Sequence, residues 1–100
     1  MDDDISNYRI YITVANTRIA GAEQYSTNEE ITIRGASFVE MDASQTRVNF
    51  YAIKMVDPEK SLSLRRAGLL TSVVMSPMIE ERFKLYLEQL DLEAKKRALE

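Results

Sequence analysis

The first half of the chain alternates between apolar and polar positions, which is the period of a half-buried β-strand. In the stretch 7–15, Tyr8, Ile10, Ile12 and Val14 share one parity. A second alternation covers 29–34 and a third 37–42, separated by Gly35 and Ala36. This pattern predicts two strands, or one strand bent by a glycine bulge. The sequence does not decide the conformation of the polar stretch 16–28.

A further strand is predicted over 46–56, where apolar residues occupy both parities as in a central strand covered on both faces. Asp57-Pro58 then resembles the start of a helix, because the carboxylate can accept from unpaired N–H groups. Leucine and valine recur at helical spacing from there, which predicts a helix over 58–75. The alternation Ser61-Leu62-Ser63-Leu64 leaves a strand possible for part of this segment.

The segment 77–98 carries the strongest helix pattern in the chain. Ser76-Pro77 repeats the helix start signal, acidic residues lie near the beginning, and Lys95, Lys96 and Arg97 lie near the end. Strands followed by helices predict an α+β fold. We expect a small antiparallel sheet of three to four strands and one or two C-terminal helices in a single domain, residues 1–100, with a disordered acidic N-terminus at 1–6.

Two apolar stripes follow the final helix when residues are placed at 100° intervals. One broad face suits the core and comprises Ile79, Phe83, Tyr86, Leu87, Leu90 and Ala94. The other recurs every seven residues on nearly the opposite side and comprises Met78, Leu85, Leu92 and Leu99. We interpret this second stripe as an oligomer interface. The alternatives are packing against 58–75 as a helical hairpin within one monomer, and chance exposure.

The outward face of the predicted sheet interleaves basic and aromatic residues. If the aliphatic parity points to the helices, the other displays Arg9, Tyr11, Arg34, Phe38, Arg47 and Tyr51. Such faces bind single-stranded nucleic acid by stacking bases on rings while arginines contact phosphates. Glu30 and Glu40 weaken this hypothesis. The alternatives are a contact with another protein and a plain solvated surface.

The composition excludes most familiar catalytic sites. The chain has no cysteine and no histidine, and its three glycines are too far apart for a phosphate-binding loop. The pairs Glu40–Asp42 and Arg65–Arg66 fit solvated surface better than a metal site or a phosphate clamp. We therefore expect no enzyme activity, no metal and no cofactor.

The formal net charge of −3 provides no overall positive field for nucleic acid or membranes. The acidic start and the short aliphatic runs favour a cytoplasmic, intracellular protein without a membrane segment. The sequence-based hypothesis is a non-enzymatic interaction or assembly domain that acts as a homo-oligomer, for example in a phage or another large particle. The alternatives are a sheet that binds single-stranded nucleic acid and a small acidic inhibitor or adaptor that docks on another protein.

Overall fold

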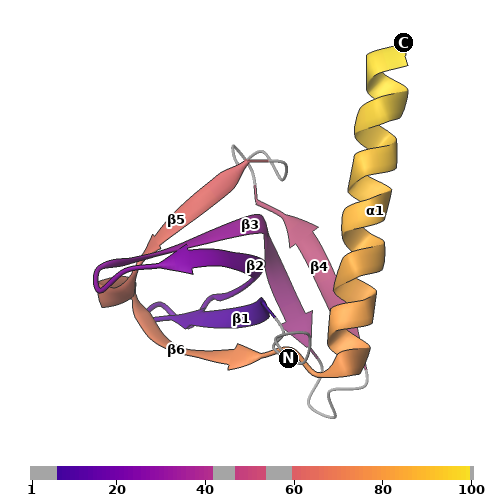
Figure 1. Cartoon of the computed structure of the whole chain (residues 1–100). Helices are drawn as coiled ribbons and strands as arrows, with labels where there is room; N and C mark the ends of the chain where they lie inside the picture. Colours follow the sequence, from indigo (N-terminus) through magenta and orange to yellow (C-terminus); the bar gives the residue numbers. More distant parts are fainter. Residues whose placement is uncertain (1–6, 42–46, 54–59, 100) are drawn as a thin grey trace, which may run out of the picture.

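Antiparallel strands make up most of the described chain up to residue 74, and one long described helix follows them (Figure 1). The structure is a computed structural model that describes residues 7–41, 47–53 and 60–99. The strands are β1 (Tyr8–Thr13), β2 (Arg18–Ser26), β3 (Glu30–Met41), β4 (Val48–Ala52), β5 (Ser61–Arg65) and β6 (Leu69–Val74). A 3-10 turn, η2 (Arg66–Gly68), joins β5 to β6, and the helix is α1 (Pro77–Leu99). The predicted α+β fold is confirmed, with more strands and one helix fewer than its upper limit.

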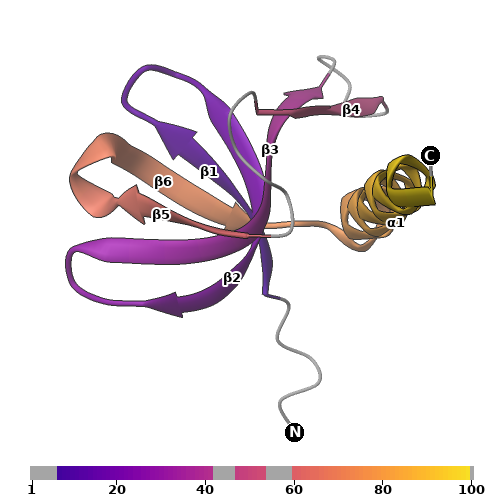
Figure 2. The same ribbon diagram turned by 90° about the horizontal axis from the view of Figure 1, so that it is seen from above.

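The sheet has the order β4-β3-β2-β1-β6, and β5 also pairs with β3. The long strand β3 serves two partners, because residues 30–34 pair with β5 and residues 37–41 pair with β4. The sheet therefore divides at the middle of β3. One part curls through β5, η2 and β6, and the other carries β4 towards α1 (Figure 2).

The division of the sheet lies at two glycines on neighbouring strands. Gly35 has a φ of 73°, a left-handed conformation that favours glycine, and the pairing of β2 with β3 shifts register beside it. Across the pair, a Cβ on Gly21 would lie 2.7 Å from Cδ1 of Ile33, so any other residue there would force the buried Ile33 side chain to shift. Residues 30–34 and 37–41 thus belong to one strand bent at a glycine bulge, which was one of the two sequence interpretations.

The curled sheet separates two apolar clusters. The inner cluster comprises Tyr11, Ile19, Ile31, Ile33 and Ala36, with Ile53, Leu62, Leu64 and Leu69 packed against it. The helix-side cluster comprises Ile10, Ala20, Val39, Val48, Met75, Ile79 and Phe83. Neighbouring residues of β1 therefore contribute to opposite clusters, and both Ile10 and Tyr11 are buried. β1 is covered on both faces, although its sequence alternates as in a half-buried strand.

Helix α1 begins where Ser76-Pro77 predicted. The backbone N–H of Ile79 donates to the Ser76 hydroxyl at 3.4 Å, which satisfies one of the unpaired donors of the first turn. Phe83 is fully buried and contacts the rings of Phe50 and Tyr8 at centroid distances of 5.0 and 5.9 Å. This ring cluster fixes the first half of the helix to the sheet.

Two predicted elements differ from the structure. The segment 58–75 is not a helix, because 61–65 and 69–74 are strands joined by a 3-10 turn, and residues 58 and 59 lie outside the described residues. Of the predicted strand 46–56, the structure describes residues 47–53, and these contain β4, which ends the order of strands instead of lying at its centre. Residues 18–26, whose conformation was open, form β2. The N-terminal residues 1–6 lie outside the described part of the chain.

Candidate functional site

The second apolar stripe of α1 is exposed along its whole length. Its four side chains have exposed fractions of 43% for Met78, 54% for Leu85, 58% for Leu92 and 89% for Leu99. The first half of the helix packs on the sheet through its other side, where Ile79 and Phe83 are buried. The stripe therefore faces away from the only core that α1 contacts among the described residues.

The far end of α1 extends beyond the sheet. Leu90 is partly buried, but every residue from Asp91 to Leu99 is exposed, and Figure 1 shows this end of the helix standing clear of the strands. The ion pairs Glu80–Lys84 and Asp91–Lys95, at 3.4 and 3.1 Å, support the helix locally. Surface pairs of this type contribute only about 0.3–0.5 kcal/mol each. Packing against the described strands stabilises only the first half.

The helical-hairpin explanation for the stripe is wrong. It required residues 58–75 to form a second helix beside α1, but 61–65 and 69–74 form β5 and β6. Leu62, Leu64 and Leu69, which gave that segment its helical spacing, pack in the inner cluster of the sheet instead. No described segment covers Leu85 and Leu92, so a contact with another chain and simple exposure are the interpretations that remain.

The six residues predicted on the outward sheet face do not share one surface. Tyr11, Ile19, Phe38 and Tyr51 form a single cross-strand row over β1, β2, β3 and β4. Exposure rises along this row from 0% at Tyr11 to 39% at Phe38 and 48% at Tyr51. Tyr11 is enclosed because the curled part of the sheet covers its end of the row. Only the Phe38 end is accessible.

Arg34 lies on the opposite face from Phe38. It pairs with Ala22, which pairs in turn with Tyr8, and Tyr8 packs on the helix side against Phe83. The extra residue at the Gly35 bulge reverses the alternation, so residues of equal parity before and after it point to opposite faces. Arg9 is partly buried at the Tyr11 end of the sheet, and Arg47 is exposed just before β4. The predicted basic and aromatic face is thus divided.

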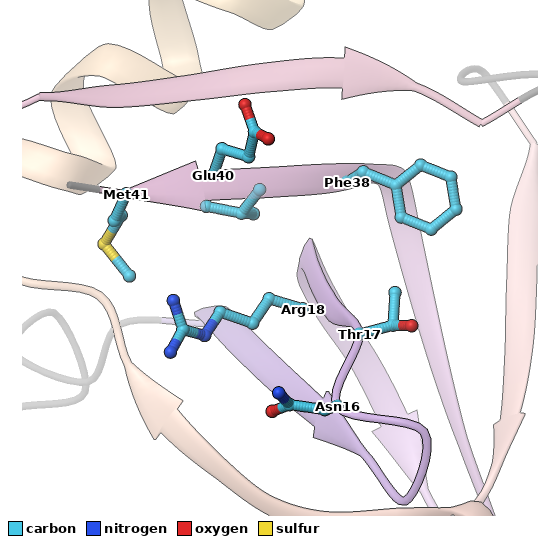
Figure 3. A pocket seen from close by; sticks show the side chains of 7 residues that line it. Asn16, Thr17, Arg18, Phe38, Glu40 and Met41 are labelled. Carbon is cyan, nitrogen blue, oxygen red and sulfur yellow. The ribbon is translucent and has the colours of Figure 1, made fainter. Parts of the chain in front are cut away.

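The accessible end of the row carries one polar contact. The Tyr51 hydroxyl donates to Oε2 of Glu40 at 3.0 Å, and this hydrogen bond raises the pKa of Tyr51. A shallow hollow of about 370 Å³ lies beside it, lined by Asn16, Thr17, Arg18, Phe38, Val39, Glu40 and Met41 (Figure 3). The hollow contains one cationic and one anionic side chain, which gives it no strong preference for a charged ligand.

The buried hydroxyl of Tyr11 is satisfied within the fold. It donates to Oε1 of Glu23 at 3.1 Å. Burial is the main reason why the pKa of Tyr11 is raised, and the neighbouring Glu23 carboxylate adds to the effect. Tyr11 is therefore a structural residue that links β1 to β2.

The weaker chemical candidates also have structural roles. The guanidinium of Arg66 donates through Nε to the carbonyl oxygen of Thr27 at 2.6 Å, so it anchors the turn between β2 and β3. Arg65 pairs across the strands with Glu30. Asp42, the predicted neighbour of Glu40, lies outside the described residues. Among the residues that the structure describes, no three carboxylate side chains come together as a metal site would require.

One exposed surface has no counterpart among the sequence predictions. Strand β6 displays Leu70, Val73 and Val74 with exposed fractions of 66%, 48% and 50%. In the sequence pattern, these residues contribute only to the helical spacing that predicts a helix over 58–75. The signal that could have identified the surface is the absence of any charged side chain from residue 67 to residue 79.

The chain matches no protein-family model, and no curated protein matches it. The described part of α1 is too polar to cross a lipid bilayer as a helix, and no other described helix has the length to do so.

Proposed function

We propose that this chain is a non-enzymatic assembly domain that associates with a second copy of itself through the stripe of Met78, Leu85, Leu92 and Leu99. The observation that carries the proposal is the exposure of this stripe on a helix whose opposite side is fixed to the sheet by Phe83. Four large apolar side chains at a heptad spacing on one side of a helix suit a contact with another helix.

A second copy fits because the stripe is complementary to itself. Its four positions are seven residues apart, so an antiparallel α1 places Leu85 opposite the partner's Leu92 and Met78 opposite the partner's Leu99 at the same time. Helices packed in this way have axes about 8–10 Å apart. The sheets then lie on the outer sides of the helix pair, where they do not obstruct it.

The energy of this contact sets the concentration at which it should be tested. Complete burial of a leucine or methionine contributes about 1.5–3 kcal/mol, so eight side chains that are already partly buried contribute on the order of 10 kcal/mol. The cost of association is about 4–15 kcal/mol. The net free energy is then about −6 kcal/mol at best, so we expect a weak dimer with a Kd of tens of micromolar or higher, of the kind that is strengthened when many copies assemble into a larger particle.

The test is the mass of the purified protein by light scattering over a range of concentrations. At the lowest concentrations that give a dimer of the unchanged chain, we expect the double variant Leu85→Glu, Leu92→Glu to be a monomer. A matched control is Ala94→Glu, Ala98→Glu, which adds the same charge at exposed positions away from the stripe on the same helix. A monomeric unchanged chain, or equal dimer content in both double variants, would refute the proposal.

The divided sheet face does not favour a nucleic-acid-binding function. Arg34 and the Phe38–Tyr51 pair point to opposite faces, and the Tyr51 hydroxyl is engaged by a carboxylate. A single-stranded nucleic acid needs rings and cations along one path.

A further inference from the structure

Strand β6 ends the order of strands in the sheet and has a free edge. It pairs with β1 on one side, and no other described strand pairs with it on the other. In Figure 1 it runs along the lower left of the sheet, with β1 above it. Natural proteins usually protect such edges, because unpaired N–H and C=O groups offer a template for another strand.

The usual protection by charge is absent here. Residues 67–79, which include the whole of β6, contain no charged side chain. By contrast, β5 has Lys60 immediately before it and ends at Arg65, and β4 follows directly after Arg47. Edge charges prevent unwanted pairing because they would have to be desolvated between two strands. The β6 edge imposes no such cost on a pairing strand.

The backbone groups at the free edge can be assigned from the ladder. The N–H of Met75 donates to the carbonyl oxygen of Tyr8 at 3.1 Å, so Met75 faces β1. Antiparallel ladders alternate, so Val73 also faces β1, whereas the N–H and C=O groups of Ser72 and Val74 point to the free edge. Two outward-facing residues therefore flank Val73 symmetrically.

We infer that the free edge of β6 pairs with the same edge of a second copy, antiparallel, about a two-fold axis at Val73. In this register Ser72 faces the partner's Val74 and Val74 faces the partner's Ser72, which forms four backbone hydrogen bonds. On one side of the sheet, Val73 contacts the partner's Val73. A second copy brings an equally uncharged edge, and the exposed Val73 and Val74 of both copies are buried in the same contact, which favours a second copy over an unrelated strand.

This surface is distinct from the stripe on α1 and does not depend on it. Each two-fold contact uses only its own patch and leaves the other free, so a chain with both contacts forms a row of copies instead of a closed pair. The edge contact therefore supplies a second connection for the assembly proposed above.

The test uses the Leu85→Glu, Leu92→Glu chain, in which the α1 stripe is disrupted, so that association through β6 is measured alone. We expect a dimer at high protein concentration by light scattering. Val73→Lys and Val73→Glu each place like charges opposite each other at the axis and should give monomers. An equimolar mixture of the two variants should regain the dimer, because the charges are then opposite. This rescue also shows that both variants fold.

The matched control is Asn49→Lys, an exposed position on the edge strand β4, which should leave the dimer unchanged. Amide hydrogen exchange provides the second measurement: the amides of Ser72 and Val74 should become protected on dimerisation, while that of Val73 is already protected by β1. A monomer at every concentration, a Val73→Lys dimer, failure of the mixture, or open-ended aggregation would overturn the inference. None of these results bears on the α1 stripe.

Discussion

Leu87 of the helix packs directly on the backbone of Gly35 at the bend of β3. A Cβ on Gly35 would lie 3.0 Å from Cδ2 of Leu87, and the φ of Gly35 is 73°. The bend that divides the sheet and the packing of α1 therefore depend on the same missing side chain.

Substituting Gly35 should destabilise the protein for both reasons. We expect Gly35→Ala to lower the free energy of unfolding by about 1–3 kcal/mol, because a left-handed φ is strained for alanine and Leu87 must shift. Urea denaturation measures this loss. Gly68→Ala is the control, since an added Cβ there meets no atom within 4 Å and its φ is not positive. If the two variants were equally stable, Gly35 would not determine the bend.

Removing Leu87 as well separates the two causes. In the double variant Gly35→Ala, Leu87→Ala, the steric contact between the two side chains is removed, whereas the backbone strain at residue 35 remains. The double variant should therefore lose less stability than the sum of the two single variants, as expected for residues in contact. Additive losses would mean that Leu87 does not constrain Gly35.

Phe83 should account for much of the attachment of α1 to the sheet. Its ring is fully buried and contacts the rings of Tyr8, Phe50 and Tyr86. We expect Phe83→Ala to cost about 3–5 kcal/mol of unfolding free energy, as for other buried aromatic residues. Leu99→Ala, at the exposed end of the helix, should change the stability of dilute protein very little. Circular dichroism during urea denaturation would show both effects.

Ionisation of Tyr11 should lower the stability of the folded protein at alkaline pH. Burial raises its pKa in the folded protein above the usual tyrosine value of about 10. The neutral form is therefore favoured by folding, and its contribution to stability is complete below pH 10 and decreases as the pH rises above it. Tyr11→Phe should remove this part of the alkaline decrease and cost about 1 kcal/mol at neutral pH for the lost hydrogen bond to Glu23. An unchanged slope of stability against pH in the variant would contradict this role.

The divided sheet face predicts the outcome of a nucleic-acid titration. Labelled single-stranded DNA or RNA should not bind at low salt, where a phosphate-led interaction is strongest. Binding that is lost on Phe38→Ala and weakened by salt would instead restore the sheet as a nucleic-acid site.

Local signals predicted the two ends of the described chain well. The alternation of residues 7–15 and the Ser76-Pro77 start of the last helix both depend on neighbours in sequence, and both elements are confirmed. The helix predicted over 58–75 was wrong, because its paired leucines and valines satisfy helical spacing and strand alternation almost equally. Only packing decides between them: Leu62 and Leu64 of this segment pair with Ile33 and Ile31 of β3 and pack against the inner cluster.

The prediction of a single basic and aromatic sheet face was wrong, and the reason cannot be found in any local sequence pattern. The bulge at Gly35 reverses which parity faces the helix, and closure of the curled sheet buries Tyr11. The exposed positions of Met78, Leu85, Leu92 and Leu99, in contrast, follow directly from helix periodicity, and the structure places all four on the exposed side of α1.

The most direct test of self-association through α1 is a distance between spin labels. The chain has no cysteine, so Gln89→Cys can be labelled at a single position beside the midpoint of Leu85 and Leu92. Packed helix axes are about 8–10 Å apart, so we predict a label separation of roughly 20 Å in the antiparallel dimer. Labels at Arg97→Cys should be farther apart, because the two sites are offset by roughly 25 Å along the helix axis. The absence of a short distance at Gln89, at concentrations where the protein is expected to be dimeric, would contradict the proposed interface.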